Sequence, residues 1–387
     1  MTRATRLWRE EVVDEDGWTR TGVVIEHPWE PRQTLWYRVR LPEGWKLSPS
    51  SDALVLVPLY KAMRARSPLH VEGEVSPSLL ANLEEFQAVM ACWHRGRFRQ
   101  VEIVAEREVE QPRGEQGALV AFSGGVDGCF TAYRHAIGAA GRQTQTLRAG
   151  VMMHGFDFPI AEDEGFRVAA DRAEAMLATL GIPLIRLASN IQKVEQAWDD
   201  VVGAVLASCF HLLQPNARVG LIASEFPYHL LAGPGWSSHP VADPLLSSAS
   251  LRIVHDGAGF TRPQKIQAIA EWPAGMKNLY VCWEGPRTGL NCSRCSKCVR
   301  TILAFRALGL PLPEGFQDVS DADIRALGPL KGPPQLVQRQ LLDVIDERGL
   351  TGSWVRAARS VYYRGRGRDH LRVLTGHARR RARALLR

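Results

Sequence analysis

The first third of the chain carries short apolar runs that predict strands. These runs are GVVIEH at 22–27, TLWYRVRL at 34–41, ALVLVPLY at 53–60 and QVEIVAE at 100–106. Apolar residues at helical spacing follow Ser76 and Pro77, a cap and a first-turn proline that together predict one helix over 76–96. We therefore expect a small α+β domain at residues 1–111.

Strands alternate with helices in the middle of the chain, after a polar stretch that reads as a linker. The predicted strands are 118–122, 147–155, 182–188, 217–224, 251–256 and 279–283, and the predicted helices are 129–139, 162–180, 191–213 and 262–271. This alternation is typical of an α/β domain with a parallel sheet, whose ligands bind at the carboxyl ends of the strands. We place that domain at residues 115–315.

The composition is that of an ordinary globular protein, with 45% hydrophobic and 23% charged residues. The first residues are charged and carry no apolar signal region, and no run approaches the roughly 18 apolar residues of a membrane span. We therefore expect a cytoplasmic protein without a transmembrane segment. The sequence leaves the oligomeric state open.

The net charge of +7 comes from the end of the chain. From Thr351 onward there are eleven arginines, no lysine and one aspartate, so the rest of the chain is slightly acidic. We expect residues 316–387 to be a helical, arginine-rich segment. It could meet an acidic partner, whether nucleic acid, protein or lipid, or be a solvated helix.

The stretch VAFSGGVDGC at 120–129 predicts a glycine turn between a strand and a helix. Gly124 and Gly125 allow the backbone to approach an anion closely, and the N-terminus of the following helix directs N–H groups toward it. Such a turn at the first strand of a parallel sheet is suited to a phosphate.

Four of the seven cysteines are clustered with a C-x9-C-x2-C-x2-C spacing. Four thiolates can close a tetrahedron around zinc, which would then be structural because no position stays open for water. An iron–sulfur cluster is the alternative for this spacing. The cluster consists of Cys282, Cys292, Cys295 and Cys298.

The loop resembles the Ser-Gly-Gly-x-Asp-Ser motif of the PP-loop ATP pyrophosphatase superfamily. The loop and the cysteines together resemble the 7-cyano-7-deazaguanine synthases in particular, over roughly residues 115–310. The resemblance implies a domain of the adenine nucleotide alpha hydrolase type that binds ATP and Mg²⁺. The residues it implies at the phosphates are Ser123, Gly124, Gly125, Val126, Asp127 and Gly128. Gly128 departs from the motif, which has a serine or threonine there, so one hydroxyl contact is lost.

Further candidates follow from their order along the chain. The resemblance implies that the end of the second strand reads adenine, which makes Met153 and His154 candidates, and that a lysine placed like Lys265 contacts phosphate. Thr261 and Gln264 predict a capping box that puts Lys265 in the first turn of a helix. The loop at 223–248 is the candidate for reading the substrate through Ser224, Glu225, Ser238, His239 and Asp243.

Three functional hypotheses remain. The first is an ATP-dependent ligase that adenylates a carboxylate or amide oxygen of a small-molecule acid or a protein terminus, for attack by ammonia or another nitrogen nucleophile. Asp127 and Lys265 would be its catalytic residues. The second is an RNA-modifying enzyme of the same superfamily that uses the arginine-rich segment. The third, motivated by Gly128, is a non-catalytic nucleotide-binding scaffold.

Overall fold

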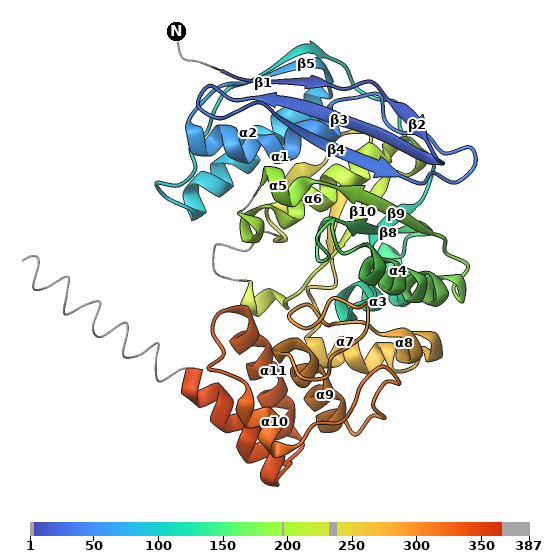
Figure 1. The fold of residues 1–387 in the computed structure, drawn as a ribbon, viewed down its shortest axis with the longest axis vertical. Coiled ribbons are helices and arrows are strands. Elements are labelled where there is room, and N and C mark those ends of the chain that lie inside the picture. The colour runs from blue at the N-terminus through green and yellow to red at the C-terminus, as the bar shows by residue number, and fades with distance from the viewer. Residues whose placement is uncertain (1–3, 196, 232–237, 366–387) are drawn as a thin grey trace, which may run out of the picture.

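The computed structural model describes residues 4–195, 197–231 and 238–365. Its strands form one mixed, mostly parallel sheet of 11 strands in the order β11-β10-β7-β8-β9-β4-β3-β1-β5-β6, with β2 paired to β3 (Figure 1). The strands are β1 (Thr5–Arg9), β2 (Val13–Glu15), β3 (Trp18–Glu26), β4 (Gln33–Val39), β5 (Leu69–Val75), β6 (Ile103–Glu108), β7 (Ala118–Ala121), β8 (Leu147–His154), β9 (Leu184–Ser189), β10 (Val219–Ala223) and β11 (Arg252–Asp256). The fold is therefore α/β.

Helices cover both faces of this sheet. They are α1 (Asp52–Ala65), α2 (Pro77–Trp93), α3 (Val126–Ala136), α4 (Asp163–Ala178), α5 (Ile191–Val194), α6 (Trp198–Leu212), α7 (Arg262–Ile269), α8 (Pro273–Asn278), α9 (Ser296–Leu308), α10 (Asp321–Ala326) and α11 (Pro333–Glu347). Among the described residues, no helix is long and apolar enough to cross a lipid bilayer.

Strands β7 to β11 are all parallel and form the central part of the sheet. The chain runs from β7 through β8 to β9 on one side, and then crosses back to β10 and β11 on the other side of β7. This reversal makes the carboxyl ends of β7 and β10 the topological switch point, where open α/β sheets bind their ligands.

The N-terminal strands continue the same sheet. β4 pairs antiparallel with β9 through the partners Tyr37–Ser189, Arg38–Ala188 and Val39–Leu187. Beneath this seam, one core packs side chains of β4 against α1, α6 and the central strands. The α+β segment and the parallel strands therefore share both a sheet and a core.

The opposite face of the central sheet packs against α3, α4, α7 and α9, together with α11 and a helical segment at residues 353–365. Val355, Ala358 and Val361 are each at most 4% exposed in this core. A solvated helix was one interpretation of the arginine-rich segment, but the helical turns at residues 353–365 are part of the core. The remaining arginines, from 366 onward, lie outside the described residues.

Two predicted strands are wrong. Residues 53–60 lie inside α1 and are all buried. A short apolar run fits a buried helix as well as a strand, and the sequence prediction of a strand was therefore wrong here. Residues 279–283 are not a strand but an irregular segment, in which the Tyr280 N–H donates to the Gly124 carbonyl at 3.0 Å. That contact ties the segment to the glycine turn.

Candidate functional site

The glycine turn joins β7 to α3 in a conformation that glycine permits. Gly124 has φ of +76°, and a Cβ there would lie 3.2 Å from the Met176 Cε. Gly125 then precedes Val126, the first residue of α3, and caps that helix with extended backbone angles. The turn therefore depends on glycine at 124.

The backbone of this turn presents donors at a helix N-terminus. With the described residues, none of the N–H groups from Ser123 to Gly128 makes a hydrogen bond, whereas the Cys129 N–H donates to the Gly125 carbonyl at 2.9 Å. The Ser123 hydroxyl is likewise free of a described partner. Free N–H groups at the positive end of a helix dipole form an anion-binding site.

Asp127, in the first turn of α3, is held by two cations from α7. Its carboxylate accepts from the Arg262 Nη1 at 2.6 Å and from the Lys265 Nζ at 3.0 Å. Lys265 is 1% exposed and also donates to the Ser224 carbonyl. Burial alone would raise the pKa of Asp127, but the charges of Lys265 and Arg262 outweigh it and lower that pKa.

Further charges surround this cluster. The Nη2 of Arg262 is buried without a hydrogen-bond partner among the described residues. Lys297 in α9 makes no ion pair with any described residue. Burial desolvates the Arg300 guanidinium and lowers its pKa to about 10. The Glu225 side chain is exposed to solvent at its surface, but partial desolvation by the surrounding protein raises its pKa against the attraction of Lys297. Cations outnumber carboxylates here, so an anionic ligand would be favoured.

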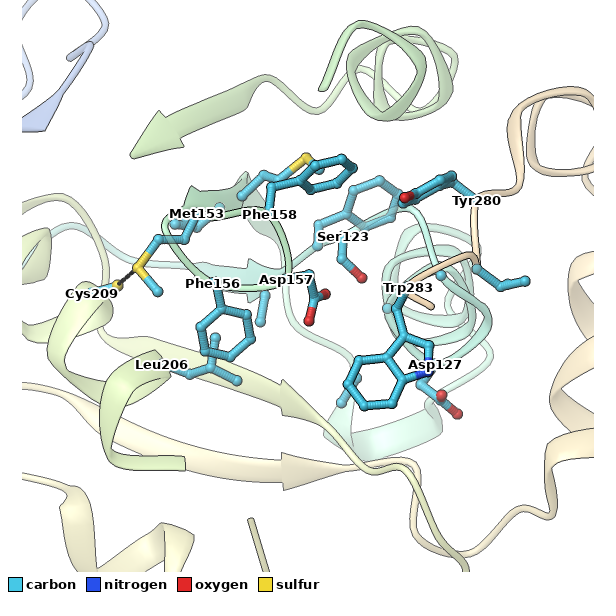
Figure 2. Close-up of a pocket in the computed structure, with 18 of the residues that line it drawn as sticks. Ser123, Asp127, Met153, Phe156, Asp157, Phe158, Leu206, Cys209, Tyr280 and Trp283 are labelled. Carbon is cyan, nitrogen blue, oxygen red and sulfur yellow. Dashed lines mark hydrogen bonds between the residues drawn. The ribbon is translucent and has the colours of Figure 1, made fainter. Parts of the chain in front are cut away.

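A cavity of about 160 Å³ opens beside the turn, at the switch point between β7 and β10 (Figure 2). Ser123, Gly125, Asp127 and Gly128 line one end of it, together with Lys297. The remaining wall is largely apolar and aromatic, formed by Met153, Phe156, Phe158, Leu206, Cys209, Phe210, Tyr280 and Trp283 among others. Figure 2 shows Asp157 pointing into the same space, where it has no hydrogen-bond partner among the described residues. The cavity thus combines a polar end, lined by free N–H groups and a lysine, with an apolar one.

The two candidates at the end of β8, Met153 and His154, point to opposite faces of the sheet. Met153 lines the cavity and lies 3.4 Å from Cys209, sulfur to sulfur. His154 points to the other face of the sheet, because successive side chains of a strand alternate. There it stacks on Phe166 and bonds the Pro159 carbonyl through Nε2 at 2.9 Å, and burial lowers its pKa. His154 therefore packs α4 rather than lining the cavity.

The polar residues of the 223–248 loop mostly bond one another. His255 joins Asp243 through Nδ1 at 2.8 Å and Ser224 through Nε2 at 2.7 Å, while Ser238 donates to Asp243 at 2.7 Å. Ser224 and Asp243 are both 0% exposed, and His239 bonds the Leu231 carbonyl. This network braces the loop and positions the Ser224 carbonyl against Lys265. Residues 232–237 of the loop lie outside the described residues.

The four cysteines come together beside the cavity. Their sulfur atoms all lie within 4.8 Å of one another, so they could bind a metal. The Sγ atoms of Cys282 and Cys295 are 3.9 Å apart, as are those of Cys292 and Cys298. Cys298 sits in the first turn of α9, whose C-terminus is closed by Gly309 at φ +66°. Cys282 itself lines the cavity, so the cluster fixes one of its walls.

Sequence reasoning missed Arg262, Lys297, Asp157, Tyr280 and Trp283. The capping box of Thr261 and Gln264, which the structure contains, could have pointed to Arg262, because this residue lies in the same first turn as Lys265. The others lie on irregular segments or on a helix beside the cysteines, and no local pattern distinguishes them.

No protein-family model, curated protein or solved structure matches this chain.

Proposed function

We propose that this protein is an ATP-dependent ligase of the PP-loop type, which adenylates a carboxylate or amide oxygen for attack by a nitrogen nucleophile. Three features support this: the 3-2-1-4-5 order of β9, β8, β7, β10 and β11, the cavity at their switch point, and the cluster of buried cations. The sequence resemblance to 7-cyano-7-deazaguanine synthases agrees with all three.

The observation that carries the proposal is the set of free N–H groups from Ser123 to Gly128 at the N-terminus of α3. These donors and the α3 dipole suit the β and γ phosphates of ATP. The neighbouring cations, Arg262 with its unpartnered Nη2 and Lys297, suit the negative charge that grows on a departing pyrophosphate.

The proposed reaction has two steps. An oxygen of the acid attacks the α phosphorus of ATP, and the bond to the bridging oxygen breaks, releasing pyrophosphate. Ammonia or an amine then attacks the activated carbon, which releases AMP and leaves a proton to be accepted. Glu225 has a raised pKa, has no described hydrogen-bond partner, and is under the influence of the charges of Lys297 and Arg262, so it is a candidate acceptor.

Mg²⁺ would fit this end of the cavity together with the phosphates. Each oxygen of Asp127 already accepts from a cation, so a metal there needs the negative charge of the polyphosphate beside it. Asp157 faces the cavity and offers a second carboxylate. The metal would neutralise charge on the leaving pyrophosphate.

For the cysteines we propose structural zinc. A zinc–sulfur bond of about 2.3 Å in a tetrahedron separates the sulfurs by about 3.8 Å, close to the 3.9 Å between the Sγ atoms of Cys282 and Cys295. An iron–sulfur cluster distributes four thiolates over two or four irons, so some of the sulfurs would lie further apart than around a single zinc.

The proposal is tested with ATP labelled at the α and γ phosphates, a panel of carboxylic acids, and hydroxylamine as a general nitrogen nucleophile. We expect AMP and pyrophosphate to form, together with a hydroxamate of the accepted acid. Formation of ADP with a phosphorylated acid would point to a kinase, ADP with free phosphate would point to an ATPase or a ligase that works through an acyl phosphate, and ATP binding without any turnover would favour a scaffold.

A matched pair of variants ties this activity to the cavity. Lys297→Met removes a cation that lines the cavity, and we expect AMP formation to fall by at least about tenfold. Lys277→Met makes the same change on the exposed side of α8 and should leave the rate unchanged. Equal rates for the two variants would remove the phosphate end from the mechanism.

A further inference from the structure

The N-terminal part of the sheet has an inner and an outer face, and the two differ in chemistry. Leu35, Tyr37 and Val39 of β4 are at most 1% exposed in the core shared with α1 and α6. Trp36 and Arg38 alternate with them and therefore point to the other face. In Figure 1, α1 and α2 lie below these strands, on the inner side.

The strand register extends this outer face over three strands. β1 pairs Trp8 with Val24, and β3 pairs Arg20 with Arg38, so Trp8 and Trp18 share the side of Trp36. The outer residues form what we call the Trp/Arg face, which consists of Trp8, Trp18, Trp36, Arg32, Arg38 and Arg40. All three tryptophans are half-buried and Arg32 and Arg40 are exposed.

Guanidinium groups lie over the tryptophan rings of this face. Arg32 lies 4.5 Å from the centre of the Trp8 ring, and Arg38 and Arg40 both lie 5.0 Å from that of Trp18. Among the described residues these three arginines have no carboxylate partner, in contrast to Arg20, which pairs with Glu10 at 3.4 Å. The Nε of Arg38 is buried without a hydrogen-bond partner among the described residues. The register also places Glu26 and Glu72 on the outer side, but neither pairs with these three arginines, whose N–H groups therefore stay available to a ligand.

This combination selects one class of ligand. Alternating aromatic and guanidinium planes stack with nucleobases, and the outward N–H groups of the arginines can bond phosphate. An apolar protein partner would not match three unpaired guanidiniums, because charges are depleted in the core of protein interfaces. A double helix would match less well, because its bases are stacked on one another and do not offer their faces to the tryptophan rings.

We propose that the Trp/Arg face binds single-stranded nucleic acid, with bases stacked on Trp8, Trp18 and Trp36 and phosphates held by the arginines. This surface is distinct from the cavity and does not depend on the ligase proposal. It would bring an RNA or DNA strand to the protein through contacts that do not read sequence.

The experiment uses the full chain and a fluorescently labelled single-stranded oligouridylate, with binding followed by anisotropy. Binding is measured at several salt concentrations, because the arginine-rich C-terminal residues can also contact phosphates and the slope reports the number of phosphate contacts that each variant keeps. We expect Trp8→Leu/Trp36→Leu to weaken binding about fivefold to a hundredfold, from the stacking of bases on aromatic rings. Arg38→Gln/Arg40→Gln should weaken it too and lower its salt dependence.

A charge-matched control is Arg95→Gln/Arg99→Gln, which changes two exposed arginines just after α2 on the inner side. This variant should bind like the wild type. Thermal unfolding and AMP formation, measured on each variant, separate lost binding from lost fold. The arginine variant changes exposed or half-buried side chains only, so it stays informative if the tryptophan variant fails to fold.

Two results would overturn the proposal. The first is equal binding by the wild type, the face variants and the control. The second is equally tight, face-dependent binding of heparin or polyphosphate, which carry no bases and would identify a general polyanion or anionic-polysaccharide surface instead.

Discussion

Replacing Asp127 with asparagine tests how the anion site is built. The carboxylate is nearly isosteric with the amide, but it balances two cations, Arg262 and Lys265, that are 6% and 1% exposed. Asp127→Asn keeps the shape and removes the charge. Those cations then face each other across a neutral side chain.

The structure sets the size of the effect. Removing one partner of a buried ion pair costs about 3–5 kcal/mol, and we expect the lower end, about 3 kcal/mol, because the Asp127 side chain is 20% exposed. The Ser224 carbonyl still accepts from Lys265, which limits the loss. AMP formation should also fall sharply, because the cations are no longer held in place around the phosphates.

The dependence on pH has a definite sign. The pKa of Asp127 is lower in the folded protein than in the unfolded chain, so its ionisation stabilises the fold above the unfolded pKa of about 4. That stabilisation is lost as the pH falls through the folded pKa. The difference in unfolding free energy between the wild type and Asp127→Asn should therefore shrink below about pH 4.

The assay is denaturant unfolding of both proteins at neutral pH, with and without pyrophosphate. Pyrophosphate should bind the two buried cations that Asp127→Asn leaves without a carboxylate, and so narrow the difference in unfolding free energy between the two proteins. Asp171→Asn is the control, because this carboxylate pairs with Arg186 at the surface and should cost less than about 1 kcal/mol. If the two variants are equally stable, the buried pair does not organise the site.

Three further predictions follow from particular contacts. Gly128→Ser should give soluble protein that binds ATP more tightly in calorimetry, because φ at 128 is helical and suits a serine. A Cβ at 128 would lie 3.2 Å from the Ala121 carbonyl oxygen, so insoluble protein would mean that this contact cannot relax. Cys292→Ser should reduce the bound metal measured by elemental analysis and unfold the α9 region first in hydrogen exchange, whereas iron and sulfide in anaerobically purified protein would exclude zinc. Truncation after Gly365 should spare AMP formation and lower the salt dependence of polyanion binding. Truncation after Leu350 should unfold the protein, because it also removes the buried Val361. Equal stability of the two truncated proteins would contradict this packing.

Local patterns predicted most elements of the central sheet, because each of its strands is a short apolar run ending in a turn. β7, β8, β9, β10 and β11 all lie within or close to their predicted ranges. The continuity of the sheet could not be predicted. It depends on three residue pairs between β4 and β9, and pairing between strands so distant in sequence leaves no local signal.

The candidate site shows the same limit. Asp127 and Lys265 were chosen separately, by motif and by order along the chain, and the structure joins them at 3.0 Å. His154 and Asp243 were chosen as polar residues beside strand ends. His154 points to the far face of the sheet, and the Asp243 carboxylate bonds His255 in a buried network. Whether a polar side chain faces a cavity depends on strand alternation and on the other ends of its hydrogen bonds.

The seam between β4 and β9 has a consequence for how the chain folds. Without β4, the outer edge of β9 would be a row of unpaired N–H and C=O groups on a parallel sheet, which is a template for aggregation. During synthesis β4 leaves the ribosome long before β9, so the N-terminal strands can be ready to close that edge when it appears. The first part of the chain would then protect the edge of β9 as the rest of the protein folds, and the parallel strands that carry the cavity could not be expressed as a separate, stable domain.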